Sequence, residues 1–346
     1  MKTTYLFIFP IFTVFVLNLS ISPVFAQAPT TPKILFTSTR DGNYEIYTMN
    51  PDGSEQVRIT QHPAVDYGAA WSPTGEKIIF VSDRSGRPDL YLMAPDGSNV
   101  RRIFRRKIVG RRTSPTWSPD GKQIAYMHDY WPDGGGTSGM YIATLGDQDE
   151  EFIIGQFYPA WSPDGTEIAY RASDLEGTWI AFINVRTRKV EPLLPKKAFR
   201  WEKGPSWSAT GDKLVFTGNK HPLPPILDKE LNEARALHEA WADKDTVYII
   251  NRDGTGLKQL IPEDGQEVQA AALSPNGGEV IYTQEINNQR QLFKIDVNSG
   301  VRTQLTHIGQ RNIGGDWFDP AYTLPVSPQP HLLTTTWADV KTHKLH

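Results

Sequence analysis

The side chains that most often perform catalysis are present in this chain, but they form no recognisable catalytic motif. There is no cysteine, and neither a G-x-S-x-G nucleophile elbow nor an H-E-x-x-H zinc motif occurs. The eight histidines are scattered at His62, His128, His221, His238, His307, His331, His343 and His346. We therefore expect no catalytic residue, no metal and no cofactor, and we interpret the protein as a binding module.

A run of basic residues offers a different chemistry, the binding of anions. Seven cations fall between positions 101 and 112, and such a cluster suits an acidic polysaccharide, a phosphate or the acidic face of a partner. Arg101 and Arg102 are also explained as exposed residues of an outer strand. Arg112 is assigned to the rim described below, so the candidate basic loop contains Arg105, Arg106, Lys107 and Arg111.

A recurring phrase indicates the elements that position these side chains. It reads WSPTGEKIIF from Trp71, WSPDGKQIAY from Trp117, WSPDGTEIAY from Trp161, WSATGDKLVF from Trp207 and LSPNGGEVIY from Leu273. Trp317 is a sixth anchor, and the successive intervals are 46, 44, 46, 66 and 44 residues. A period in the forties with several short strands per copy is typical of propeller blades. The sequence therefore predicts an all-β fold, a six-bladed β-propeller of four-stranded antiparallel blades.

The two ends of the chain are predicted to share one blade. The first copy lacks the strand that ends at the anchor and begins with Lys33–Thr37, whereas Asp316–Phe318 forms such a strand without any followers. Pairing of these two segments closes the ring and removes the exposed edges.

Function is expected where the copies differ. The loops that enter each inner strand open on one face of the ring, together with the loops between second and third strands. Polar residues five positions before the anchors, with their aromatic neighbours, are predicted to form a ligand-binding or partner-binding rim at the channel mouth. This rim set is Asp66, Tyr67, Arg112, Gln156, Tyr158, Trp201, Glu202 and Asn312. The alternative is that these residues belong to ordinary solvated loops.

The anchors themselves are interpreted as structural. A large aromatic at a fixed register fills the wedge between adjacent blades, and this applies to Trp71, Trp117, Trp161, Trp207 and Trp317. The Asp-Gly pairs that follow the third strands lack the ligand spacing of a calcium loop and are interpreted as hairpin turns.

The long interval in the fifth copy predicts a helical insertion over residues 221–242. Leu227, Leu231, Ala234, Leu237 and Trp241 follow three-to-four spacing and give one apolar stripe. Because the insertion joins a second to a third strand, we expect it on the rim face, overhanging the channel. It is either a lid or partner helix, or a helix that packs on neighbouring loops.

The N-terminus is predicted to be a signal peptide, residues 1–26. Lys2 precedes an apolar stretch from Leu6 to Leu17, and cleavage is expected after Ala26. A retained membrane anchor is the alternative, although Pro23 makes the apolar run short for spanning. The expected domains are then the propeller over 27–320 and a proline-punctuated C-terminal tail over 321–346.

The repeat resembles the TolB-type propeller family. The shared pattern is WSPDG-x-x-IAY, as at Trp117 and Trp161, with D-G-x-x-x-I-Y from Asp41 and DGS-x-x-x-R-I from Asp52. The resemblance covers residues 33–320 and implies a six-bladed propeller. The family's namesake is a periplasmic protein that binds a peptidoglycan-associated lipoprotein. Only Gln27–Pro32 precede the first strand after the expected cleavage, so the separate N-terminal domain of TolB is expected to be missing.

Together these features predict an exported, monomeric propeller, periplasmic or secreted, that binds an envelope protein or polysaccharide. The net charge of −3 and export argue against a nucleic acid partner, and no membrane span is expected after cleavage. The alternative is a polysaccharide lyase, because propeller lyases of pectic sugars resemble this repeat and bind metal through channel histidines. Here only His62 and His307 occupy loops beside the channel.

Overall fold

The computed structural model describes residues 27–106, 109–130, 135–174, 177–195, 198–199, 201–225, 230–263 and 266–323, without the side chains of 201–203. The predicted signal peptide and nearly all of the predicted tail lie outside the described residues.

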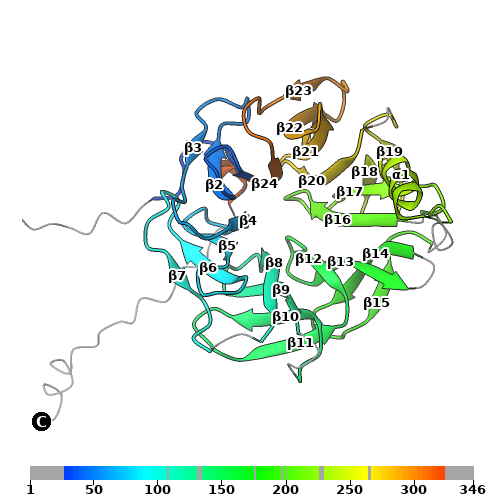
Figure 1. Ribbon diagram of the computed structural model, residues 1–346. Helices are drawn as coiled ribbons and strands as arrows, with labels where there is room; N and C mark the ends of the chain where they lie inside the picture. Colours follow the sequence, from blue (N-terminus) through cyan, green and yellow to red (C-terminus); the bar gives the residue numbers. More distant parts are fainter. Residues whose placement is uncertain are drawn as a thin grey trace, which may run out of the picture.

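The described strands form six four-stranded antiparallel sheets arranged around a central channel (Figure 1). Blade 1 contains β24 (Asn312–Phe318), β1 (Lys33–Ser38), β2 (Glu45–Met49) and β3 (Val57–Arg58). Blade 2 contains β4 (Asp66–Trp71), β5 (Ile78–Ser82), β6 (Asp89–Met93) and β7 (Arg101–Arg102). Blade 3 contains β8 (Arg111–Trp117), β9 (Gln123–Asp129), β10 (Gly139–Thr144) and β11 (Glu150–Ile154).

The other half of the ring repeats this order from the channel outwards. Blade 4 contains β12 (Phe157–Trp161), β13 (Glu167–Asp174), β14 (Gly177–Asn184) and β15 (Val190–Pro192). Blade 5 contains β16 (Trp201–Trp207), β17 (Lys213–Asn219), β18 (Thr246–Asn251) and β19 (Lys258–Gln259). Blade 6 contains β20 (Val268–Leu273), β21 (Glu279–Ile286), β22 (Gln289–Asp296) and β23 (Arg302–Gln304). The predicted six-bladed propeller is confirmed.

The predicted ring closure is also confirmed. Strand β24, the last of the chain, pairs antiparallel with β1, with Ile34 opposite Trp317 and Ser38 opposite Asn312. Blade 1 is therefore built from both ends of the described chain. Because β24 supplies the inner strand, the first blade contacts its neighbours on both sides in the same way as the other five.

The core lies between adjacent blades, where the anchor tryptophans pack. Trp117 of blade 3 packs with Ile79 and Val81 of blade 2, and Trp71 of blade 2 packs with Leu35 and Ile46 of blade 1. Trp71, Trp117 and Trp161 are buried, whereas Trp207 and Trp317 are partly buried against the same kind of cluster. Their interpretation as wedge residues is confirmed.

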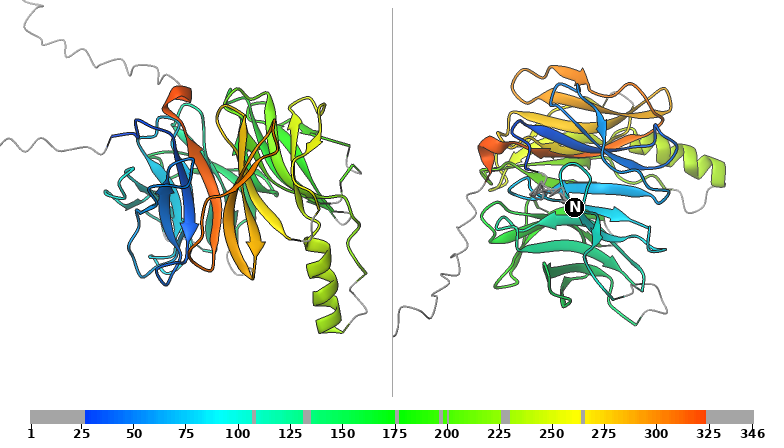
Figure 2. Two further views of the ribbon diagram at one scale, coloured as in Figure 1. Left: turned by 90° about the horizontal axis from the view of Figure 1, so that it is seen from above. Right: turned by 90° about the vertical axis from the view of Figure 1, so that its left-hand side faces the viewer.

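The insertion in blade 5 is shorter as a helix than predicted, and it does not overhang the channel. Helix α1 spans Leu231–Ala242 and stands at the outer edge of the ring (Figures 1 and 2). Only its last turn is buried: the Trp241 indole donates a hydrogen bond of 3.1 Å to the His221 carbonyl, whereas Leu231 is 84% exposed. The apolar stripe thus anchors one end of α1 beside its own blade. Across the described residues, no helix has the length and apolarity needed to cross a membrane.

Candidate functional site in the central channel

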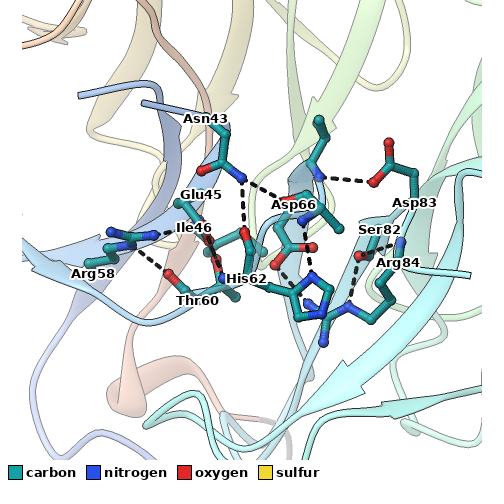
Figure 3. Close-up of polar contacts among 12 residues, drawn as sticks. Asn43, Glu45, Ile46, Arg58, Thr60, His62, Asp66, Ser82, Asp83 and Arg84 are labelled. Carbon is teal, nitrogen blue, oxygen red and sulfur yellow. Dashed lines mark hydrogen bonds and ion pairs between the residues drawn. The ribbon is translucent and has the colours of Figure 1, made fainter. Parts of the chain in front are cut away.

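Two members of the rim set, Asp66 and Asn312, are buried inside blades instead of lining the channel mouth. Asp66 is fully buried, and its carboxylate accepts a hydrogen bond of 2.7 Å from Arg84 (Figure 3). Burial raises the pKa of Asp66, and the hydrogen bonds from Ser82 and Arg84 oppose this effect. Asn312 is likewise buried and accepts a hydrogen bond of 3.1 Å from Arg40.

Arg112, a third member of the rim set, lies at the centre of a buried ionic cluster. Its guanidinium is 3% exposed, lies 3.0 Å from Asp89 and 2.6 Å from Glu150, and stacks 4.1 Å from the centre of the Phe104 ring. Burial alone would raise the pKa of Glu150, but hydrogen bonds from His128, Arg112 and Tyr126 hold it at about 2. The Arg112 charge is paired with two carboxylates and shielded from water, so it is not available to a ligand.

The chemical variety at this register therefore has a structural origin, and the expectation that these three side chains form the mouth is wrong. Blades 1, 2 and 3 satisfy Asn312, Asp66 and Arg112 with different partners from the same or the adjacent blade. Gln156 is half-buried and accepts a hydrogen bond of 2.9 Å from the backbone amide of Ser173. Trp201 and Glu202 begin β16, but their side chains lie outside the described part of the structure.

The channel itself contains a cavity of about 550 Å³. The second halves of the six inner strands line this cavity. In each strand the lining begins at the third residue before the anchor and continues into the turn after the anchor. The cavity therefore reaches the face that carries the anchor turns and η2 (Pro320–Tyr322), which is opposite to α1 (Figure 2). Among the rim residues whose side chains the structure describes, only Tyr158 belongs to this lining.

A left-handed residue gives all six inner strands the same bulge. The third residue before each anchor has a positive φ, and the pairing with the second strand is irregular in every blade. The residues are Gly68, Ser114, Tyr158, Gly204, Ala270 and Gly314, with φ of 61°, 51°, 59°, 56°, 53° and 71°. A Cβ added at Gly204 or Gly314 would meet no atom within 4 Å. Side chains at this register therefore have free space in the channel.

Tyr158 is the one large side chain at this register. Its ring is 40% exposed and lies 4.4 Å from the Arg171 guanidinium. A left-handed conformation costs a non-glycine residue about 1–2 kcal/mol, and such strain is concentrated at functional sites. The ring is thus held in the channel at an energetic cost that the glycines of blades 1, 2 and 5 avoid.

The residue just before each anchor alternates around the ring between alanine and a hydrogen-bonding side chain. Thr116, Ser206 and Asp316 each accept a hydrogen bond from the backbone amide of the next blade's anchor, at 3.3, 3.2 and 2.7 Å. In the other three blades the carbonyl of the alanine accepts from the next blade's indole: Trp117 to Ala70, Trp207 to Ala160 and Trp317 to Ala272. Every inter-blade contact at this level is therefore closed by one hydrogen bond.

Asp316 gives the cavity its charge, and sequence reasoning missed it. Among the described residues of the lining, the charged side chains are Asp316 and Asp319. Burial raises the pKa of Asp316 to about 7, although the backbone amides of Trp71 and Trp317 donate hydrogen bonds to it. The available signal was the position before Trp317, where the other copies have alanine, threonine or serine.

The predicted basic loop is partly engaged in structural contacts. Arg102, at its start, lies 2.6 Å from Asp89, and Arg111 lies 2.8 Å from Asp129. Arg105 and Arg106 are exposed, and Lys107 lies outside the described residues. The loop is on the surface, as expected, but its binding role stays a prediction.

Sheet order and channel define the class as a six-bladed β-propeller. A family model described as the TolB beta propeller domain matches residues 16–130, so this part of the chain is similar to that domain. TolB from Acinetobacter baumannii superposes with a TM-score of 0.66 and 18% identity over 82% of this chain and 66% of that one, just under two thirds.

Two further structures share the fold. A putative TolB from Agrobacterium tumefaciens gives a TM-score of 0.59 at 15% identity, covering 83% of this chain and 91% of that chain. A chain of a nidogen/laminin complex gives a TM-score of 0.60 at 12% identity, covering 84% of this chain and 99% of that chain. Identities this low establish the fold alone. No curated protein matches the sequence.

Proposed function

We propose that the protein is an exported, non-catalytic propeller that binds a protein or glycan partner of the cell envelope in its central channel. The observation that carries this proposal is the cavity of about 550 Å³, whose wall holds the exposed and strained Tyr158. Pockets of this size, with aromatic surfaces and a few polar groups, are typical of binding sites.

The chemistry of the lining favours binding over catalysis. Among the described residues of the cavity wall there is no histidine, lysine or arginine beside the serines and threonines. An imidazole or amine base, the usual activator of a hydroxyl nucleophile, is therefore not part of that wall. No group of three or more potential metal ligands occurs in the described part of the chain. Export is supported by the predicted signal peptide, and TolB-like relatives make the periplasm the favoured location.

A pull-down from an envelope extract tests the binding site. Tyr158→Gly removes the ring and places at this position the residue that Gly68, Gly204 and Gly314 supply in other blades. We expect the variant to recover at least tenfold less partner than the wild type, the loss that one anchor residue causes when it contributes about 1.4 kcal/mol. Phe152→Ser is the control, because Phe152 is an exposed aromatic on the outer strand β11. Equal recovery by wild type and Tyr158→Gly would refute the channel as the site.

A second assay tests the absence of catalysis. The mature protein is incubated with a panel of acidic polysaccharides, with and without manganese or calcium. We expect no unsaturated sugar product. Its appearance would refute the proposal of a non-catalytic binding module and favour the alternative of a polysaccharide lyase.

A further inference from the structure

We propose that the channel cavity recognises an organic cation, an ammonium or guanidinium group, with Asp316 as its counter-ion. The proposal rests on the channel being the binding site and adds the chemical class of what enters it.

The charges of the wall all have one sign. Asp316 and Asp319 both lie on the segment that ends β24 and enters η2, and no cationic side chain belongs to the described lining. Asp316 is partly buried, and the hydrogen bonds that it receives come from neutral backbone amides. A carboxylate with little access to water and no cationic partner is costly. A ligand cation would supply the missing counter-charge.

The remaining wall suits a cation that is only weakly hydrated. The anchor tryptophans and Phe318 border the cavity, but Trp71, Trp117, Trp161 and Phe318 are buried between blades. Tyr158, which is 40% exposed, is the aromatic side chain of the wall that a ligand can reach. Aromatic faces attract ammonium and guanidinium groups through the ring quadrupole. A hydrated metal ion would need several oxygen ligands, and the two aspartates are the carboxylates that the described wall offers.

The position of Asp316 in the repeat argues against a purely structural role. Thr116 and Ser206 occupy the same register in blades 3 and 5, and their hydroxyls accept the equivalent inter-blade hydrogen bond. A neutral hydroxyl therefore suffices to close the contact between blades. The carboxylate of Asp316 adds a negative charge to the channel that the ring does not need for closure.

Two sources can present this cation, a basic side chain of a partner polypeptide and a free polyamine. Titration of the full chain with N-acetyl-arginine amide represents the first, and titration with spermidine represents the second. N-acetyl-citrulline amide has nearly the same shape as the arginine probe without the charge. We expect saturable binding of at least one cationic probe and about tenfold weaker binding of the citrulline probe, equivalent to about 1.4 kcal/mol.

The matched variant is Asp316→Thr, which keeps an acceptor for the Trp71 amide as Thr116 does for Trp161. We expect it to fold like the wild type and to bind the cationic probe about tenfold more weakly. Asp120→Asn removes an exposed carboxylate from an anchor turn outside the cavity lining and should leave binding unchanged. Equal affinity of the cationic probe for the wild type and for Asp316→Thr would overturn the inference. Equal affinity of the wild type for the citrulline and arginine probes would overturn it as well.

The outcomes separate this inference from the proposed function. If Tyr158→Gly loses partner capture but the wild type shows no preference for a cationic probe, the channel remains the binding site and the inference of a cationic ligand is rejected. Unchanged capture in Tyr158→Gly rejects the channel itself.

Discussion

The carboxylate of Asp316 accepts a hydrogen bond of 2.7 Å from the backbone amide of Trp71, which belongs to the next blade. This contact joins the last strand of the chain to the first complete blade. It places a carboxylate in the wall of the channel, at a register where the other polar blades use threonine and serine. Asp316 therefore contributes both a hydrogen bond to the contact between blades 1 and 2 and a carboxylate to the channel wall.

Stability should decrease with rising pH because of Asp316. Burial raises the pKa of Asp316 to about 7 in the folded protein, against about 3.9 in an unfolded chain. Between these values the folded state keeps a proton that the unfolded state has lost, so stability falls as pH rises, by about 4 kcal/mol at most. The other titratable side chains of the described lining are Asp319, Tyr158 and Tyr322.

Urea unfolding of wild type and Asp316→Thr at several pH values checks this prediction. The variant should be more stable than the wild type at pH 8, and the difference should shrink at pH 4. A stability difference between the variant and the wild type that is the same at pH 4 and pH 8 would contradict a raised pKa for Asp316.

Arg112 should be essential for stability. Substitution by methionine leaves Asp89 and Glu150 with less compensation in the interior, and removing one partner of a buried ion pair costs about 3–5 kcal/mol. Arg111→Met is the control, because the Arg111 side chain is 54% exposed. Similar unfolding midpoints for the two variants would show that the Arg112 cluster contributes little.

Tyr158→Gly should leave stability within about 1 kcal/mol of the wild type. Glycine relieves the strain of a φ of 59°, which offsets the lost contact with Arg171 and the greater entropy of glycine in the unfolded chain. Thermal unfolding measures the balance. A large loss of stability would make Tyr158 a packing residue and would weaken its assignment to the binding site.

Removal of β24 should abolish cooperative unfolding. A chain that ends before Asn312 lacks the inner strand of blade 1, so β1 loses its partner and the ring is open. The control ends after Thr323 and keeps every described strand. If the shorter chain unfolds as sharply as the control, the closure does not hold the ring together.

The fold was predictable because the repeat marks the same elements in every copy. The anchors, the turns and the missing first strand predicted six blades and the pairing of β24 with β1. Helix α1 was placed too early and over the channel because the spacing of Leu231 and Leu237 does not reveal that only Trp241 reaches a buried surface.

The candidate site was predictable only in part. Asp66, Arg112 and Asn312 are polar residues at the ends of strands, and their sequence does not show that Arg84, Glu150 and Arg40 lie against them. Tyr158 was identified as an aromatic neighbour of that register, but the bulge at its position depends on a positive φ that the sequence does not show. Asp316 was not predicted because the sequence alone does not show that the residue before the anchor lines the channel.

Protection of a single introduced cysteine tests the central claim, that partners bind in the channel. The chain has no cysteine of its own, so Ser114→Cys marks the cavity wall, Arg105→Cys the basic loop and Ser98→Cys an exposed turn. The labelling rate with a thiol reagent is measured with and without the partner recovered from envelope extract. We predict that the partner slows labelling at position 114 at least tenfold and leaves positions 98 and 105 unchanged. Protection of position 105 with free labelling at position 114 would contradict the account and place binding on the basic loop.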